Sequence, residues 1–275
     1  MNKKFETWLI FIFLSLFTLA TLYPVLNIIS ISLRTDNAFE TQSLSLFTSE
    51  SSLGSYKTLF TETSFLKWAW NSFIVTFVVT LTGVALASTS GYALSRFNFK
   101  GRQFGMLSLL TTQMFPATML LLPFFILLSK IGLINSYFGL IIIYSSTALP
   151  FCIWQMKGYY DTIPVSLEES ARLDGCNRFQ TFYKIILPLS KPALVITALF
   201  SFMSSWSEYV VAAIILQDPE LYTLPLGLKS FQASLATQWG LYAAGAVVVS
   251  IPVTILFISL AKYLVSGLTI GSVKG

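Results

Sequence analysis

Side chains suited to chemistry are few in this chain. Its 275 residues include no histidine and two cysteines, Cys152 and Cys176, which are not in CxxC spacing, so neither a metal site nor a disulfide framework is expected. We expect both cysteines to be small buried residues. The sequence has no GxxxxGK[ST] phosphate-binding loop and no paired acids placed for acid–base catalysis. The chain is therefore not expected to be an enzyme, to hydrolyse ATP or to hold a cofactor of its own.

One acidic residue, Glu208, interrupts an otherwise uncharged apolar stretch. A carboxylate at the centre of a bilayer costs about 2.5–3.5 kcal/mol on insertion scales, so it should face a cavity or the protein interior and have a partner. Two interpretations stay open. The segment either lines or gates a transport pathway, or Glu208 forms a hydrogen bond that packs this helix against another subunit. The pathway candidates are Ser204, Ser205, Trp206, Glu208 and Tyr209.

Long apolar windows surround these residues. The chain is 55% hydrophobic and 11% charged, which is typical of a membrane protein rather than a soluble domain. A membrane-spanning helix needs about 20 mostly apolar residues. Six windows meet this length, at residues 8–31, 70–94, 104–128, 138–156, 192–216 and 241–261. We predict an all-α polytopic membrane protein that forms a single transmembrane domain with six spans.

The basic residues predict the orientation of these spans. Twelve of the 17 lysines and arginines lie on one side if both termini are cytoplasmic, which satisfies the positive-inside rule. Orientation thus accounts for the isoelectric point of about 9.1, and no nucleic-acid partner is implied. Near predicted span ends, where an indole favours the lipid–water interface, lie Trp8, Trp70, Trp154 and Trp239.

Small residues recur every fourth position at Gly83, Ala87 and Gly91, which predicts close contact between helices there. Each proline within a window removes a backbone donor and tends to kink its helix. The third window contains Pro116 and Pro123.

The cytoplasmic loop at residues 157–191 carries start and stop signals for two short helices. Ser166 and Glu169 have capping-box spacing, and Gly175 suits a left-handed helix end. Asn177 can cap a second helix, which should end before Pro188. The loop is predicted to be a helix-turn-helix outside the bilayer.

The same loop resembles the EAA loop of bacterial ABC importer permeases. The matching residues are Glu169, Ala171, Asp174 and Gly175, followed by Ile185, Leu187 and Pro188, with Ser170 in place of a more usual alanine. In that family the first helix of the loop is a coupling helix that sits in a cleft of a separate ATPase. The resemblance implies coupling through these residues, with Arg172 and Glu169 as charges at the rim. It also implies two ATPase copies that bind ATP and magnesium, a sister permease subunit and an extracytoplasmic sugar-binding protein.

Further segments resemble the carbohydrate branch of this family, in particular the smaller permease subunit of maltose and maltodextrin importers. Residues 217–240 resemble an external loop that enters the sugar-binding protein, with the candidates Tyr222, Leu224, Pro225, Phe231 and Trp239. For the aromatic residues of this loop, a plain interfacial belt is the alternative interpretation. The tail at residues 266–275, with Gly271, Lys274 and Gly275, resembles one that reaches the interface between the ATPases.

The resemblance implies that the chain forms half of an alternating-access pathway. It would lie in a bacterial plasma membrane, either an inner membrane or a cell membrane, where lipid surrounds it. The alternatives are a permease for another sugar, an ion-coupled secondary transporter and a membrane scaffold. An ion-coupled transporter usually shows an internal repeat and coupling-ion ligands near the midplane. This chain has one acid at that depth and no visible repeat.

Overall fold

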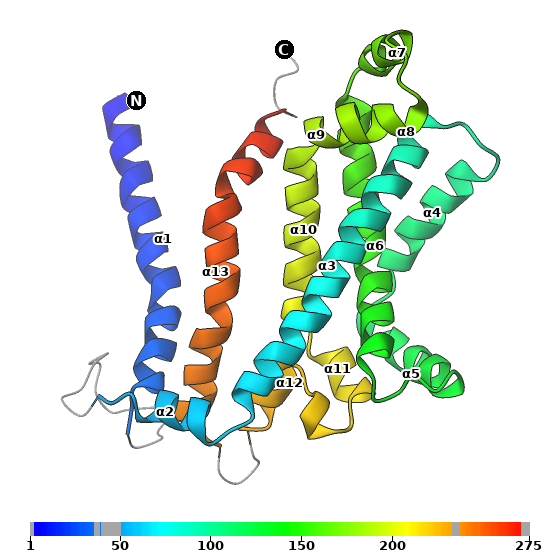
Figure 1. Cartoon of the computed structure of the whole chain (residues 1–275). Helices are drawn as coiled ribbons and strands as arrows, with labels where there is room; N and C mark the ends of the chain where they lie inside the picture. The colour runs from blue at the N-terminus through cyan, green and yellow to red at the C-terminus, as the bar shows by residue number, and fades with distance from the viewer. Residues whose placement is uncertain (1–2, 36–38, 40–50, 233–236, 271–275) are drawn as a thin grey trace. The chain divides into compact units, whose positions relative to one another are not determined.

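The computed structural model describes residues 3–35, 39, 51–232 and 237–270, which form helices, turns and coil without a strand among them (Figure 1). The chain divides into two compact units. One comprises residues 1–67 and 227–252, and the other comprises residues 68–226 and 253–275. The second unit contains most of the helices, the loop at residues 157–191 and Glu208.

The first unit contains α1 (Lys3–Ser32) and α2 (Gly54–Thr61), with the adjoining parts of α12 (Leu224–Lys229) and α13 (Trp239–Ile270). The side chains of α1 are exposed along most of its length, as expected of a helix that lipid surrounds. Two hydrogen bonds join its end to α2. Ser32 Oγ and Tyr56 OH lie 2.8 Å apart, and Ser52 N donates to Leu33 O at 2.8 Å.

The second unit is built on three long helices that run alongside one another: α3 (Phe65–Arg96), α6 (Tyr137–Thr162) and α10 (Lys191–Trp206) (Figure 1). The other elements are α4 (Arg102–Gln113), η1 (Ala117–Leu120), α5 (Leu121–Lys130), α7 (Val165–Leu173), α8 (Arg178–Thr181), the π-helical turn η2 (Phe182–Ile186), α9 (Leu187–Leu189), α11 (Val210–Ile215) and η3 (Pro219–Leu221). Figure 1 shows α7 and α8 at one end of this unit and α5 and α11 at the other.

Four helices are long and apolar enough to cross a membrane, at Lys4–Ser32, Phe65–Arg96, Tyr137–Thr162 and Trp239–Tyr263. Two bent pairs raise the number to as many as six if each pair is one span. The third apolar window, expected as one helix, is one of these pairs. It breaks after Gln113 and turns by 99° before continuing as α5. Pro116 lies at the break with an extended backbone, because proline lacks the N–H of a continuing helix and disfavours helix at the preceding residue.

The fifth apolar window also differs from one continuous helix. Its first part, α10, ends at Trp206, and α11 begins at Val210. The carboxylate of Glu208 accepts hydrogen bonds from Val211 N at 3.0 Å and Ala212 N at 3.3 Å. This side chain takes the place of the backbone carbonyls that those amides would use in an unbroken helix, so the new helix starts here.

The strip of small residues on α3 permits the close contact that the sequence predicts. A Cβ added at Gly91 would lie 2.9 Å from Met156 Cβ and 3.0 Å from Lys157 N, both on α6. One added at Gly83 would lie 2.6 Å from Ser201 Oγ on α10. Ala87, between them, is fully buried. The prediction of close contact is confirmed, and α3 is held against both neighbours.

Two apolar clusters fill the second unit. The first surrounds Tyr144 and combines side chains of α3, α6 and α11. The second surrounds Met156 and Tyr160 and includes Ile186, from the segment that follows α8. Cys152 is buried in the second cluster as predicted, whereas Cys176 is half-buried at the turn after α7.

We predict that Gly91→Ala destabilises the protein by about 1–3 kcal/mol, because the added methyl group overpacks the contact with α6. The midpoint of thermal unfolding of the detergent-purified protein measures this loss. Gly158→Ala is the matched control, since Gly158 is also helical but has no atom within 4 Å of an added Cβ. Alanine is favoured over glycine in helices, so the control should be neutral or stabilising. Equal midpoints for the two variants would contradict the packing argument.

Candidate functional site

The helix α7 begins differently from the prediction. It starts at Val165, directly after Pro164, and no side chain caps it. The predicted capping box at Ser166 and Glu169 is therefore wrong. Proline has a fixed φ that suits the start of a helix, so Pro164 takes the N-cap position two residues before the predicted cap, and Ser166 lies inside the first turn.

The end of α7 follows the prediction. Gly175 adopts a φ of +88°, and Cys176 N donates to Ala171 O at 2.9 Å while Gly175 N donates to Arg172 O at 3.1 Å. These are the two hydrogen bonds of a Schellman motif. Asn177 then caps α8 in a reciprocal capping box with Gln180, at 2.8 and 2.9 Å. The predicted turn between two helices is confirmed.

The second helix does not end before Pro188, so that prediction is wrong. Helical backbone continues from α8 through the π-helical turn into α9, where Pro188 lies in the first turn. Proline is tolerated there because the first helical amides need no intrahelical partner. Ile186 is fully buried, Ile185 and Leu187 are half-buried, and Pro188 is exposed. The second part of the loop is therefore packed into the apolar cluster around Met156.

The two faces of α7 differ sharply. Glu168 and Ala171 are buried, with Glu168 only 4% exposed. Glu169, Arg172, Asp174 and Gly175 are exposed, and so is Leu173, at 89%. One face of α7 thus packs against the rest of the protein, while the opposite face exposes an apolar leucine and charged side chains.

Glu168 is held by an ion pair with Arg96 at the end of α3. Arg96 Nε donates to Glu168 Oε1, and Tyr92 OH donates to Glu168 Oε2 at 2.7 Å. Arg96 Nη2 also donates to Ile163 O at 2.8 Å, at the end of α6. We call these four residues, Tyr92, Arg96, Ile163 and Glu168, the clamp. It joins α3, α6 and α7 at a single buried point.

Neighbouring contacts extend the clamp. Asp161 on α6 accepts from Ser95 Oγ at 2.6 Å and from Lys157 Nζ at 2.5 Å. The Tyr92 ring lies 4.7 Å from the Phe182 ring, measured between centroids, so α3 also contacts the second half of the loop. These contacts favour joint movement of the loop and the membrane helices over independent movement.

The sequence analysis missed Glu168 and selected its neighbour Glu169. Helical spacing contained the necessary signal, since Glu168 and Ala171 are three residues apart and share a face. A carboxylate on the buried face of α7 needs a basic partner, and Arg96 lies two residues after the predicted span at 70–94.

Glu208 has partners within this chain. Tyr144 OH donates to Glu208 Oε2 at 2.7 Å, in addition to the two backbone amides of α11. Its carboxylate is thus satisfied without a second subunit, which removes the reason for inferring an intersubunit hydrogen bond.

The other pathway candidates are divided by burial. Ser205 is buried and donates to Thr76 Oγ1 at 3.1 Å, and Trp206 is buried against Phe202. Ser204 is half-buried and Tyr209 is exposed. Tyr209 and Glu208 therefore lie at the accessible break between α10 and α11, while Ser205 and Trp206 pack inward.

The start of the predicted external loop, at residues 220–224, is held against α3 by hydrogen bonds. Asn71 Nδ2 donates to Glu220 O at 2.9 Å and to Tyr222 O at 3.0 Å, and Leu224 N donates to Ser72 Oγ at 2.6 Å. Leu224 and Phe231 are buried, whereas Tyr222, Pro225 and Trp239 are half-buried. The tail residues Gly271, Lys274 and Gly275 lie outside the described residues.

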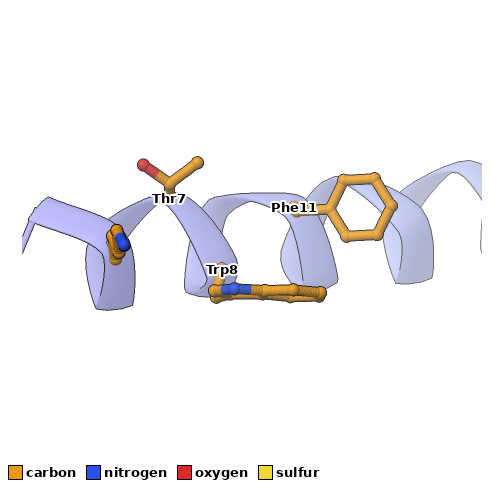
Figure 2. Close-up of a pocket in the computed structure, with 4 residues that line it drawn as sticks. Thr7, Trp8 and Phe11 are labelled. Carbon is orange, nitrogen blue, oxygen red and sulfur yellow. The ribbon is translucent and has the colours of Figure 1, made fainter.

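A hollow of about 420 Å³ beside α1 is lined by Lys4, Thr7, Trp8 and Phe11 (Figure 2). All four residues come from consecutive turns of one helix. The hollow has a single wall and offers a ligand no enclosure. Among the described residues, no group of three or more histidines, cysteines or acids is placed to hold a metal ion.

Comparison with known proteins assigns the family. The family model described as "Binding-protein-dependent transport system inner membrane component" matches residues 83–270, which include the clamp, the loop and Glu208. The chain belongs to this family.

Relatives of this family member include permeases of sugar transport systems. The maltodextrin transport system permease protein MdxG of Bacillus subtilis is 36% identical, over 96% of this chain and 95% of its own length. The galactooligosaccharides transport system permease protein GanQ of the same organism is 37% identical, over 96% of this chain and 94% of its own length. A chain from the crystal structure of a bacterial ABC transporter that imports the acidic polysaccharide alginate has a TM-score of 0.83. It is 27% identical and covers 95% of this chain and 97% of its own.

We predict that Glu168→Gln loosens α7 from the protein. Removal of one charge from a buried pair costs about 3–5 kcal/mol, because the remaining charge stays desolvated without compensation. Hydrogen–deuterium exchange should become faster in the amides of residues 165–175. Glu169→Gln is the control, since Glu169 is exposed and its loss should leave exchange unchanged. Equal protection of these amides in both variants would contradict the proposed role of the clamp in holding α7.

We also predict that Glu208→Ala destabilises the break between α10 and α11 by about 1–3 kcal/mol, because two amides and Tyr144 lose an acceptor. Thermal unfolding of the purified protein measures the loss. Glu208→Gln keeps one side-chain oxygen and should lose less. Ser207→Ala, at an adjacent exposed residue, is the control. If Glu208→Ala is as stable as this control, the capping role of Glu208 is refuted.

Proposed function

We propose that this chain is one of two membrane-spanning subunits of a binding-protein-dependent ABC importer for oligosaccharides, with maltodextrins as the first candidate substrate. The single observation that carries this proposal is the form of α7: a short helix with one face clamped to the membrane helices and its other face exposed. Such a helix is suited to receive movement from outside and pass it inward. Membership of the transport family and the sugar-permease relatives support the assignment.

In this proposal the chain has six spans and cytoplasmic termini. The spans are the four long helices, the bent pair of α4 and α5, and α10 with α11, while Arg178–Leu189 stays outside the bilayer. The end of the second unit that holds α7 faces the cytoplasm. Support comes from the basic residues near this end, including Arg96, Arg102, Arg172 and Lys184, because positive charge is enriched in cytoplasmic segments.

The exposed face of α7 would dock in a groove of an ATPase, and two copies of that ATPase would serve the two permease subunits. Leu167 and Leu173 offer the apolar contact, and Glu169 and Arg172 lie at its rim as charges that orient the helix. When the ATPases close, α7 would carry the ends of α3 and α6 with it through the clamp. The pathway between the two permease subunits would then open outward. The tail at Gly271, Lys274 and Gly275 would contribute to the ATPase interface.

The opposite end would receive the sugar-binding protein. Asn71 and Ser72 hold residues 220–224 against α3, so this part of the loop would act as a fixed base. The half-buried aromatic residues Tyr222 and Trp239 are the candidates for contact with the binding protein or its sugar, since aromatic rings stack on sugars. Near the break after α10, Glu208 and Tyr209 are candidates for the pathway lining.

A second candidate substrate is galactooligosaccharide, because the galactooligosaccharide permease relative is as similar as the maltodextrin one, at 37% and 36% identity. The test uses proteoliposomes that contain the complex purified through a tag on this chain. Its cognate binding protein, loaded with maltotriose or with galactobiose, should stimulate ATP hydrolysis and sugar uptake. Ion-driven uptake without ATP would support a secondary transporter instead. If neither sugar stimulates ATP hydrolysis or is taken up, the proposed importer function is refuted.

We predict that Gly175→Asp lowers uptake several-fold while the protein still reaches the membrane. A side chain at a φ of +88° costs about 1 kcal/mol and shifts the docking face of α7. Uptake in whole cells, normalised to the amount in the membrane, measures this effect. Gly132→Asp is the matched control, since Gly132 also has a positive φ and open space around it but lies in the turn after α5. An equal fall in both variants would show that strain alone, rather than docking, lowers transport.

A further inference from the structure

A second cavity, of about 710 Å³, lies where the connection between α3 and α4 meets α6. Its polar wall includes Arg102 and Lys157, and its apolar wall includes Phe99, Phe104, Leu107 and Trp154. All of these residues belong to the second unit. Arg96 and Glu168 of the clamp do not line this cavity, which is therefore separate from the site described above.

The polar wall favours an anion. No acidic residue is among the described residues that line the cavity. Lys157 forms an ion pair with Asp161 at 2.5 Å, whereas the Arg102 guanidinium donates to the neutral Asn98 Oδ1 at 2.7 Å and has no ion pair among the described residues. The 12-residue helix α4 also begins here, after Gly101, without a side-chain cap. Its first amides and its dipole therefore reinforce the attraction for a negative group.

The apolar wall favours a ligand with hydrocarbon attached. Phe104 is 76% exposed and Leu107 is 54% exposed, so the polar wall continues directly into an open apolar surface. Trp154 lies beside them, as an indole ring commonly does at the level of lipid headgroups. Its Nε1 is buried and has no hydrogen-bond partner among the described residues.

We propose that this cavity binds the headgroup of an anionic phospholipid. The phosphate would lie against Arg102 and the start of α4, and the acyl chains would follow Phe104 and Leu107. Basic pockets between membrane helices on the cytoplasmic side bind such headgroups by the same chemistry. This lipid site requires that the chain be inserted in a membrane. It does not require the proposed transport function, and a test of the lipid site does not test transport.

Native mass spectrometry of the complex purified through a tag on this chain tests the proposal. Phosphatidylglycerol and phosphatidylcholine with identical acyl chains are titrated separately into the detergent solution. We expect at least one site with preference for phosphatidylglycerol, and a loss of about fivefold in its affinity in Arg102→Gln, as expected for one basic residue. Arg102→Lys keeps the charge and should retain most of the affinity.

Lys4→Gln is the matched control. It removes one positive charge beside a tryptophan and a phenylalanine, in the single-walled hollow on α1, and should leave the affinity unchanged. Equal binding of the two lipids, or equal losses in Arg102→Gln and Lys4→Gln, would overturn the proposal. Displacement of the lipid by millimolar inorganic phosphate would identify a site for free phosphate instead. Phosphatidylglycerol that binds the chain alone but not the complex would show that a partner subunit fills the cavity.

Discussion

The buried ion pair between Arg96 and Glu168 is the interaction on which the placement of α7 and its loop depends. Two charges with little access to water are costly unless each is compensated, and here Tyr92 and the Ile163 carbonyl complete the pairing. The ion pair determines the position of α7 more than it stabilises the fold, because a hydrophobic pair would hold α7 with less directional specificity. It determines where α7 lies relative to the ends of α3 and α6.

That position in turn depends on glycine. Arg96 reaches Ile163 and Glu168 because α3 approaches α6 closely at Gly91, where a side chain would meet the backbone of Lys157. The strip of small residues on α3 and the clamp therefore act together to position the exposed face of α7. At the other end of the same unit, Asn71 donates to Glu220 O and Ser72 accepts from Leu224 N, which holds residues 220–224 against α3. Both ends of α3 are thus joined to loops that the proposed partners would contact.

Local signals in the sequence predicted the turn of the loop but not the start of α7 at Pro164 or the continuation of the second helix past Pro188. Gly175 and Asn177 behave as their residue types require, because their hydrogen bonds involve near neighbours in the chain. Hydropathy also located the apolar segments, but it did not predict the breaks near Pro116 and Glu208, since composition alone does not distinguish a straight span from a bent one. The choice between Glu168 and Glu169 depended on which face of α7 is buried, and that is determined by contacts with α3, more than seventy positions earlier.

We expect the clamp to pass movement of α7 to the membrane helices. The most direct test of this expectation is the number of sugar molecules imported per ATP hydrolysed in proteoliposomes that contain the complex, with the cognate sugar-loaded binding protein. For Glu168→Gln the account predicts continued ATP hydrolysis with a markedly lower import ratio, while Glu169→Gln, which retains the clamp, keeps the ratio of the unaltered protein. An unchanged ratio in Glu168→Gln would contradict it.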